Sequence, residues 1–250
     1  MSHKATLLMT AGVIPILSGC LANTQVPINI NDSSAPFASA RAVWHPRTQQ
    51  VDQAMAEVSD GVEFQYTRTV GHGDQALETG KVMSVGGSSV TGPQQISHRA
   101  DISYAHLAYS GTAFMEAYPA EMDIFMGLGR VDYRLSSEVT TAAPLMLQSS
   151  QTDYALTMGM GLRWRLMEHT SAEGRIVLFT QNLLSYFLRT FGNGDQTDMI
   201  QGELALVYKP VKSMALRGGY AWMSLTPEKT ADSPLEFRVR GPLVGLEVFF

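Results

Sequence analysis

Hydrophobic and polar residues alternate with period two from Tyr154 to Leu166. One phase is apolar throughout, and the other carries small residues and the arginines Arg163 and Arg165. Period two predicts a β-strand, whose successive side chains point to opposite faces of a sheet. Tyr154 and Trp164 bracket the apolar row, and at a rise of about 3.3 Å per residue and a tilt of about 40° they span roughly 25 Å. That height matches the lipid-facing band of an outer-membrane barrel. A half-buried strand of a soluble sheet is the alternative for this stretch.

Seven further stretches predict strands, and the connections between them are long and short in turn. They cover roughly residues 62–70, 98–109, 122–129, 175–189, 200–208, 214–222 and 235–250. The run at 175–189 fits a buried strand or a helix, and its place in the alternation favours a strand. The pattern predicts an all-β fold, an eight-stranded antiparallel up-and-down transmembrane barrel with both chain ends on the side of the short turns. A soluble eight-stranded barrel of lipocalin type is the alternative.

On two of these strands the apolar phase changes part-way along. Ile102 and Tyr104 fall on one phase of the second predicted strand. Leu107 and Tyr109 fall on the other, so we expect a β-bulge between the two pairs. The last strand changes phase likewise, and Gly241-Pro242 is the expected bulge there.

Composition agrees with alternating strands in a membrane. Charged residues make up 16% of the 250 residues, against about 25% in an average soluble protein. Outside the N-terminus, no apolar run reaches the roughly 18 residues of a spanning helix. The net charge is −5 with no cluster of basic residues, which excludes a nucleic-acid-binding surface. A single cysteine excludes an intrachain disulfide.

The first twenty residues read as a secretory signal, with a short basic start and a short apolar core. They end in Leu17-Ser18-Gly19-Cys20, which resembles the lipobox of bacterial lipoproteins. The resemblance implies cleavage after residue 19 and a diacylglycerol and an N-acyl chain on Cys20, with no other cofactor. Residue 21 is not the Asp that commonly retains lipoproteins in the inner membrane, so delivery to the outer membrane is implied. An ordinary signal peptide with a chance cysteine is the alternative.

These signals divide the chain into three parts. Residues 1–19 form the signal peptide, residues 20–60 a lipidated periplasmic tether rich in Asn, Ser, Ala and Pro, and residues 61–250 the barrel. The barrel ends on apolar residues that alternate up to a terminal aromatic, and this resembles the assembly signal of outer-membrane barrels. The residues of that signal are Val244, Leu246, Val248 and Phe250.

The inward phase of the predicted strands carries seven charged residues: Glu63, Asp123, Arg163, Arg165, Glu203, Arg217 and Glu247. Eight strands leave an interior just wide enough for side chains, and an unpaired buried ion costs several kcal/mol. Four acids against three arginines therefore predict a plugged lumen crossed by arginine–carboxylate pairs. A narrow or gated pore is the alternative. In strand count, loop asymmetry and this charge arrangement, residues 61–250 resemble the small OmpA-like outer-membrane barrels.

Catalytic and metal-binding motifs are absent from the sequence. His72 and Asp74 form the only close pair in the first long loop, and a polar loop explains them. We expect a non-catalytic lipoprotein in the outer membrane of a Gram-negative bacterium, with a periplasmic N-terminus and a structural, scaffolding or interaction role. The expected partners are the lipid bilayer, the barrel-assembly and lipoprotein-sorting machinery, and a periplasmic or cell-surface protein. The alternatives are a pore, a lipid-modifying enzyme and a lipid-anchored carrier.

Overall fold

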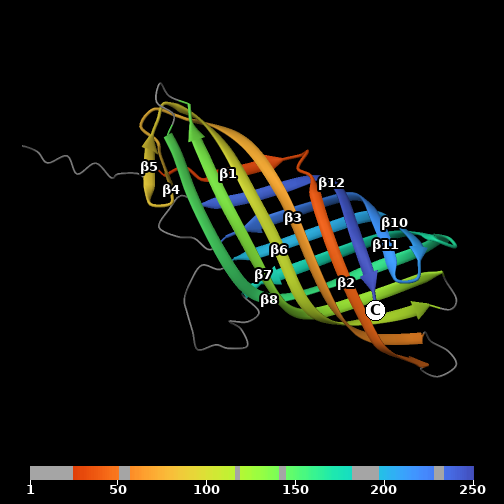
Figure 1. Cartoon of the computed structure of the whole chain (residues 1–250). Helices are drawn as coiled ribbons and strands as arrows, with labels where there is room; N and C mark the ends of the chain where they lie inside the picture. The colour runs from red at the N-terminus through yellow and green to blue at the C-terminus, as the bar shows by residue number, and fades with distance from the viewer. Residues whose placement is uncertain (1–24, 51–56, 116–118, 141–144, 182–196, 228–233) are drawn as a thin grey trace, which may run out of the picture.

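The chain is built almost wholly of β-strands. The computed structural model describes residues 25–50, 57–115, 119–140, 145–181, 197–227 and 234–250, and this part forms twelve strands (Figure 1). None of its residues belongs to a helix with the length and apolarity that crossing a bilayer requires. The prediction of an all-β fold is confirmed. In the ambiguous run at 175–189, residues 175–180 belong to a strand, and residues 182–189 lie outside the described residues.

In chain order the strands are β1 (Ile28–Asp32), β2 (Phe37–Gln50), β3 (Glu57–Leu77), β4 (Val82–Val85), β5 (Ser88–Thr91), β6 (Gln94–Met115), β7 (Ala120–Val139), β8 (Leu145–Met167), β9 (Thr170–Thr180), β10 (Asp198–Val211), β11 (Met214–Thr226) and β12 (Leu235–Phe249). β4 and β5 form a two-stranded hairpin, and the other ten strands form one sheet.

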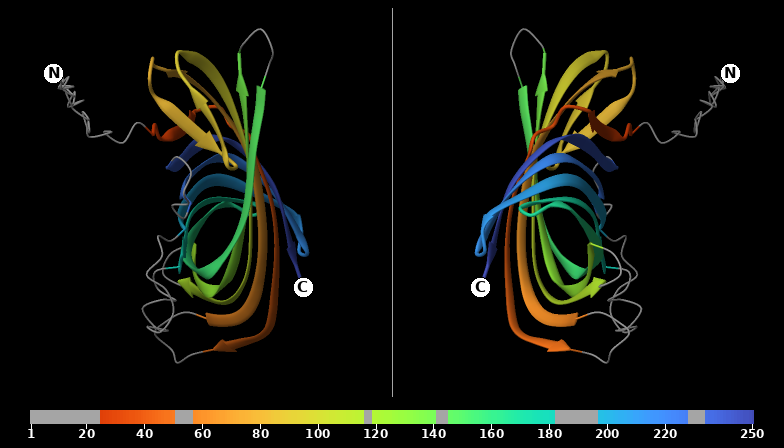
Figure 2. Two further views of the ribbon diagram at one scale, coloured as in Figure 1. Left: turned by 90° about the vertical axis from the view of Figure 1, so that its left-hand side faces the viewer. Right: turned by 90° about the vertical axis from the view of Figure 1, so that its right-hand side faces the viewer.

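The ten-stranded sheet closes on itself. From β2 the hydrogen-bonded order runs through β3, β6, β7, β8, β9, β10 and β11 to β12, and every step is antiparallel. β12 then pairs with β2 in parallel, while β1 lies along the earlier half of the same β12 edge. Figure 2 shows the strands curving round a common interior. The prediction of eight antiparallel strands is wrong, because β2 adds a ninth position to the ring and pairs with β12 in parallel.

The two ends of the closed sheet differ in their connections. We call the end with the connections β6–β7, β8–β9 and β10–β11 the short-turn end, and the opposite end the long-loop end. Gln25 bridges to Val82 in the β4–β5 hairpin, so the described chain begins at the long-loop end. Phe250 lies at the short-turn end, where its N–H donates to the carbonyl of Val43. The first described residue and Phe250 therefore lie at opposite ends of the sheet, because β2 runs in the direction of β12. The predicted position of the N-terminus itself falls in residues 1–24, outside the described residues.

The prediction that residues 20–60 form a tether is also wrong for two segments of that range, and residues 20–24 and 51–56 lie outside the described residues. Phe37–Gln50 is a strand of the closed sheet, and Ile28–Asp32 a second one. The side chains of Ile28, Ile30 and Phe37 are buried. The predicted boundary at residue 61 consequently falls inside β3.

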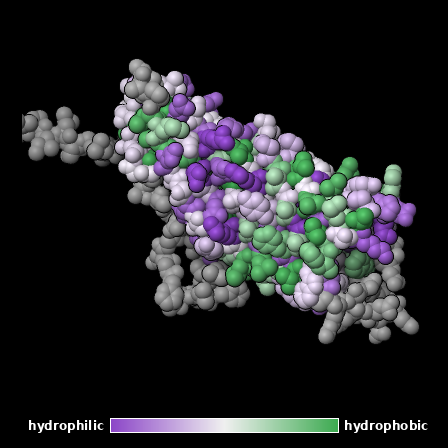
Figure 3. Space-filling view, in the orientation of Figure 1, coloured by the Kyte–Doolittle hydropathy of each residue, from purple (hydrophilic) through white to green (hydrophobic). Residues whose placement is uncertain are grey.

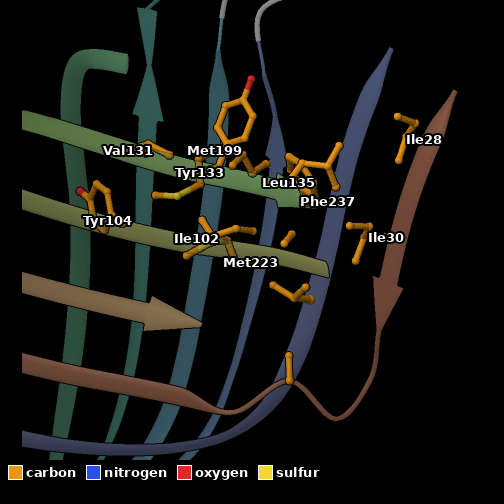
Figure 4. Packing of buried hydrophobic residues seen from close by; sticks show 14 of the residues in the cluster. Ile28, Ile30, Ile102, Tyr104, Val131, Tyr133, Leu135, Met199, Met223 and Phe237 are labelled. Atoms are coloured by element: carbon orange, nitrogen blue, oxygen red, sulfur yellow. The ribbon is translucent and has the colours of Figure 1, made fainter. Parts of the chain in front are cut away.

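Four neighbouring strands are much longer than the rest. β3, β6, β7 and β8 have 20 to 23 residues, whereas β9 to β12 have 11 to 15. We call their outer portions at the long-loop end, residues 67–77, 94–104, 131–139 and 145–153, the wall. The wall, β1 and the far ends of β10 to β12 enclose an apolar core (Figure 4). The labelled core residues are Ile28, Ile30, Ile102, Tyr104, Val131, Tyr133, Leu135, Met199, Met223 and Phe237.

Candidate functional site

The interior of the short-turn half holds a network of charges, which we call the lumen network. Its members come from eight of the nine ring positions: Arg41, Glu63, Asp123, Arg163, Glu173, Arg175, Glu203, Arg217 and Glu247. They lie together because each occupies the inward phase of its strand, and the outward phase beside it is small or apolar.

Arg41 of β2 is the centre of the lumen network. Its guanidinium lies within 4 Å of four carboxylates, at 3.0 Å from Glu63, 3.6 Å from Asp123, 3.4 Å from Glu173 and 3.3 Å from Glu247. These acids stand on β3, β7, β9 and β12, so one side chain connects strands on opposite sides of the ring. Arg41 therefore connects the parallel pairing of β2 and β12 with β7 and β9 on the opposite side of the ring.

Two further arginines share Glu173. Arg163 lies 2.5 Å from Glu173 and 2.7 Å from Glu247. Arg217 lies 2.7 Å from Glu173 and 2.9 Å from Glu203. Each bridges two acids, so the pairs form one continuous network rather than separate salt bridges.

An aromatic layer covers the network on the side of the apolar core. Arg175 pairs with Asp123 at 2.6 Å and with Glu63, and its guanidinium carbon lies 4.1 Å from the ring centre of Phe125. The ring of His106 stacks on the ring of Phe125 at a centroid distance of 5.0 Å. The Nε2 atom of His106 lies 2.7 Å from a carboxylate oxygen of Glu63. A cation over an aromatic face is favourable, most of all where water is excluded.

Water does not reach the middle of the network. The side chains of Arg175, Glu63 and Arg217 have 0% relative exposure, and that of Arg163, nearest the short-turn end, has 15%. Five carboxylates face four guanidinium groups, so the network is close to neutral. A buried ion left without its partner is strongly unfavourable. The arrangement suits a filled, cross-braced interior.

Six of the seven predicted lumen residues lie in this network, and Arg165 does not. Its side chain is 63% exposed at the rim of the short-turn end, 3.8 Å from Glu121. β8 leaves its register with β9 just beyond Arg165, before Met167. The prediction of Arg165 as a lumen residue is wrong, because the strand has passed the rim at this point.

Sequence reasoning missed four participants: Arg41, Glu173, Arg175 and His106. Arg41 was assigned to the tether and Glu173 to a turn. The alternation of Arg175, Val177 and Phe179 with outward apolar residues was the signal available for β9. For His106 the signal available in the sequence was its position two residues from Tyr104, on the same phase of the strand.

The remaining candidate residues lie apart from the network. Cys20 is outside the described residues. The side chains of Val244, Leu246 and Phe250 point outward from the end of β12, and that of Val248 lies on the same face. In the part of the chain that the structure describes, no group of three or more His, Cys, Asp and Glu side chains is placed to hold a metal ion.

The pair His72 and Asp74, and the buried His98, also have structural surroundings. His72 and Asp74 lie on the exposed outer face of β3, where the backbone N–H of His72 donates to Asp32. His98 Nδ1 lies 2.8 Å from Ser137 Oγ, and both residues are buried. A substrate in solvent has no access to that His–Ser pair.

Exposed hydrophobic side chains encircle the outside of the short-turn half, as the green region of Figure 3 shows for one face. We call them the apolar band. Its large members are Val62, Phe64, Tyr66, Leu107, Tyr109, Ile124, Met126, Leu128, Tyr154, Met160, Leu162, Trp164, Ile176, Leu178, Ile200, Leu204, Leu206, Tyr208, Leu216, Tyr220, Trp222, Val244 and Leu246. The band lies around the same half of the ring whose interior is charged.

The apolar side chains change from the inner face of the sheet to its outer face where the wall meets the band. On β12, Phe237 is fully buried inside the ring, whereas Val244 is 71% exposed on the outside. The pairing of β12 with β11 is continuous between them, so no bulge turns the strand over. On β6 the pairing is likewise continuous from Ile102 to Tyr109. Both predicted bulges are wrong, because the change of apolar phase marks a change of surroundings along an unbroken strand.

Comparisons with protein-family models, with curated proteins and with solved structures found no match for this chain.

Proposed function

We propose that this chain is a non-catalytic outer-membrane lipoprotein whose closed sheet is a transmembrane β-barrel with a structural or interaction role. The exchange of apolar phase along unbroken strands carries the proposal. A sheet surrounded by water alone keeps its apolar phase on the core side throughout. Here the apolar phase faces inward in the wall and outward in the short-turn half, as expected where strands pass from water into hydrocarbon.

The extent of the apolar band also supports a membrane. Tyr109, Tyr154, Trp164 and Tyr208 are each between 42% and 65% exposed. A large aromatic side chain has about 150–250 Å² of surface, so these four alone expose roughly 400 Å². The largest apolar patch of a typical soluble monomer totals about 300–600 Å². With its aliphatic residues the band exceeds that range, which disfavours a lipid-anchored soluble carrier.

The dry lumen network supports a filled barrel over a pore. A conducting lumen of this width would need charged groups that solvent can reach, and the side chains of Glu63 and Arg175 have no solvent-accessible surface. The lumen network braces the ring, and the long-loop end and the wall are the parts that extend beyond the band. We therefore assign the interaction role to the wall.

The position of the N-terminal end constrains the proposed lipid anchor. Cys20 precedes Gln25 by five residues, which span at most about 17 Å when extended. Cys20 would thus lie on the long-loop side of the proposed barrel. Outer-membrane barrels place their long connections outside the cell. A periplasmic N-terminus and external long loops cannot both hold, and we propose an N-terminus on the outer side.

Gel mobility tests the barrel. We expect the unboiled protein in SDS to run as a compact species and the boiled protein to run more slowly, because a closed transmembrane sheet resists SDS until heated. We also expect the protein to float with vesicles after extraction with alkaline carbonate. A chain that unfolds in SDS without heating and stays in the aqueous fraction would refute the proposal.

Cysteine labelling in intact cells tests the orientation. Glu78 at the long-loop end and Ser213 at the short-turn end are both exposed. We expect a membrane-impermeant maleimide to label Glu78→Cys and to leave Ser213→Cys unlabelled until the cells are lysed. The reverse result would place the long loops and the N-terminus in the periplasm.

A further inference from the structure

A polar groove lies on the outer face of the wall, directly beyond the apolar band. It has a volume of about 390 Å³, and its lining draws on four neighbouring strands. The outward residues around it are Arg68, Asp101, Ser103, Asp132, Arg134 and Thr152. In Figure 3 the hydrophilic region (purple) over these strands adjoins the hydrophobic region (green).

The strand register fixes the order of rows across this face. Tyr66, Ala105, Arg130 and Tyr154 are partners in the last row of the band. Arg68, Ser103, Asp132 and Thr152 form the next row, Val70, Asp101, Arg134 and Ser150 the third, and His72, Arg99, Ser136 and Gln148 the fourth. The groove thus begins one row, or two residues, beyond the aromatic edge of the band.

These rows hold more positive than negative charge. Arg68 donates from Nε to Asp101 at 3.0 Å, and Arg130 donates to Asp132 at 2.8 Å. Within the described residues, no carboxylate lies within 4 Å of Arg134, the other arginine of the groove. Arg99 in the fourth row also has no such ion pair there. The lining of the groove itself holds two arginines and two aspartates, and Arg130 and Arg99 in the adjacent rows add two positive charges.

Hydrogen bonds and an ion pair position the two carboxylates of the groove. The hydrogen bond from Arg68, and to a lesser extent the charges of Arg99 and Arg134, lower the pKa of Asp101. The hydroxyl of Thr152 donates to Asp132 at 2.5 Å. Two carboxylates therefore order the side chains around the groove, and the guanidinium of Arg134 is left to meet an anion.

We propose that this groove binds the anionic, phosphate-bearing headgroup of a lipid from the leaflet on the long-loop side. The proposal rests on the membrane position proposed above. Guanidinium groups bind phosphate oxygens through paired, charge-assisted hydrogen bonds. A headgroup at this height leaves its acyl chains against Tyr154 and the band below it, so one lipid contacts both surfaces. That double contact favours a membrane lipid over a free phosphate.

Lipid retention tests the proposal. The full chain is reconstituted in vesicles of equimolar phosphatidylglycerol and phosphatidylcholine and extracted in mild detergent, and the lipids retained per protein are counted by mass spectrometry. We expect the wild type to retain phosphatidylglycerol preferentially. A basic residue near an anionic membrane surface contributes about 1 kcal/mol, so Arg134→Gln should lower the preference about fivefold and Arg99→Gln/Arg134→Gln further. Arg238→Gln is the matched control, because Arg238 is an exposed arginine paired with Glu236 on β12, outside the groove.

The outcomes separate this proposal from the barrel proposal. A wild type that fails to insert into the vesicles, judged by heat modification on gels, would refute the membrane position and the lipid site together. Insertion without a preference for phosphatidylglycerol would refute the lipid site alone, as would an equal loss of preference in Arg238→Gln. Loss of the preference when inorganic phosphate replaces chloride at equal ionic strength would assign the groove to free anions and also refute it.

Discussion

Removal of Arg41 is the sharpest test of a dry, structural lumen. Arg41→Met keeps much of the side-chain volume and takes one guanidinium from among the carboxylates of Glu63, Asp123, Glu173 and Glu247. Breaking a buried ion pair by removing one partner costs about 3–5 kcal/mol, because the other charge stays buried without compensation. We expect a loss in this range, which is a large fraction of the roughly 5–15 kcal/mol that stabilises a folded protein.

The assay is urea unfolding of the vesicle-inserted protein, followed by the fluorescence of its three tryptophans. Arg68→Met is the matched control, since Arg68 is 55% exposed and pairs with a single carboxylate on the outer face. Exposed pairs contribute about 0–1 kcal/mol. Adding Glu247→Gln to Arg41→Met removes one surplus negative charge, so we expect about 1–2 kcal/mol of the loss to return, within the usual range of coupling between contacting residues.

Equal costs for Arg41→Met and Arg68→Met, within about 0.5 kcal/mol, would refute the reasoning. Water inside the ring would then be solvating the carboxylates that lost their partner, and the interior would be a hydrated lumen. The absence of any recovery in the double variant would also contradict it, because the loss would then come from packing rather than from charge.

Three further predictions concern other parts of the fold. Met160→Arg in the apolar band should cost about 2–4 kcal/mol of insertion free energy, and Thr152→Arg on the same face of the same strand about 0–1, both measured by urea titration in vesicles; equal costs would contradict the membrane position of the band. Burial lowers the pKa of His98 below its usual 6.5, so this side chain binds a proton more readily in the unfolded chain than in the folded one. The free energy of unfolding should therefore fall as the pH drops below about 6.5. His98→Gln should reduce this dependence of stability on pH, and an unchanged dependence would contradict the assignment. Gly161→Ala should destabilise the protein by about 1–3 kcal/mol in the same urea assay, because a Cβ there would lie 2.2 Å from a carboxylate oxygen of Asp123, and a stability equal to the wild type would contradict that close approach.

The sequence predicted the strands best where alternation was longest. Tyr154–Leu166 lies within β8, and its apolar phase is the outer face of the ring. The predicted strands at 62–70, 98–109 and 122–129 lie within β3, β6 and β7, but these strands are about twice as long. Much of the added length belongs to the wall. The outward residues of the wall are polar, so a search for apolar residues on the outward phase reads this part of the sequence as a loop.

The two expected bulges show why the wall was missed. A change of apolar phase has two physical causes, an extra residue that turns the strand over or a change in what surrounds it. A single strand does not distinguish them. The neighbours do, because β6, β7 and β12 change phase near the same level of the ring while their pairing stays in register. That coincidence exists only in three dimensions.

The lumen network illustrates the same limit. Acids and arginines on the inward phase were found on most of the predicted strands, as with Glu63 and Arg217, although Arg175 was missed on the predicted strand at 175–189. Arg41 escaped because its strand has Ala38, Ala40 and Ala42 on the outer face, and small residues give no apolar signal. Yet Arg41 contacts four carboxylates, whereas Arg217 contacts two.

The parallel closure gives those small residues a physical reason. β2 pairs with β12 in parallel on one side and with β3 in antiparallel on the other, so the last strand of the chain closes the ring against the second one. Parallel pairing is slightly weaker per residue than antiparallel pairing, and alanines add little apolar contact on the outside. Arg41 adds a buried ion pair across this seam, with its guanidinium 3.3 Å from Glu247 of β12. If the closed sheet opens anywhere, it should open between β2 and β12, and hydrogen exchange should find the amides within Leu243 to Phe249 that bond across this seam exchanging faster than those of the β6–β7 pairing. Slower exchange at the seam would show that the ring is held there by something other than Arg41.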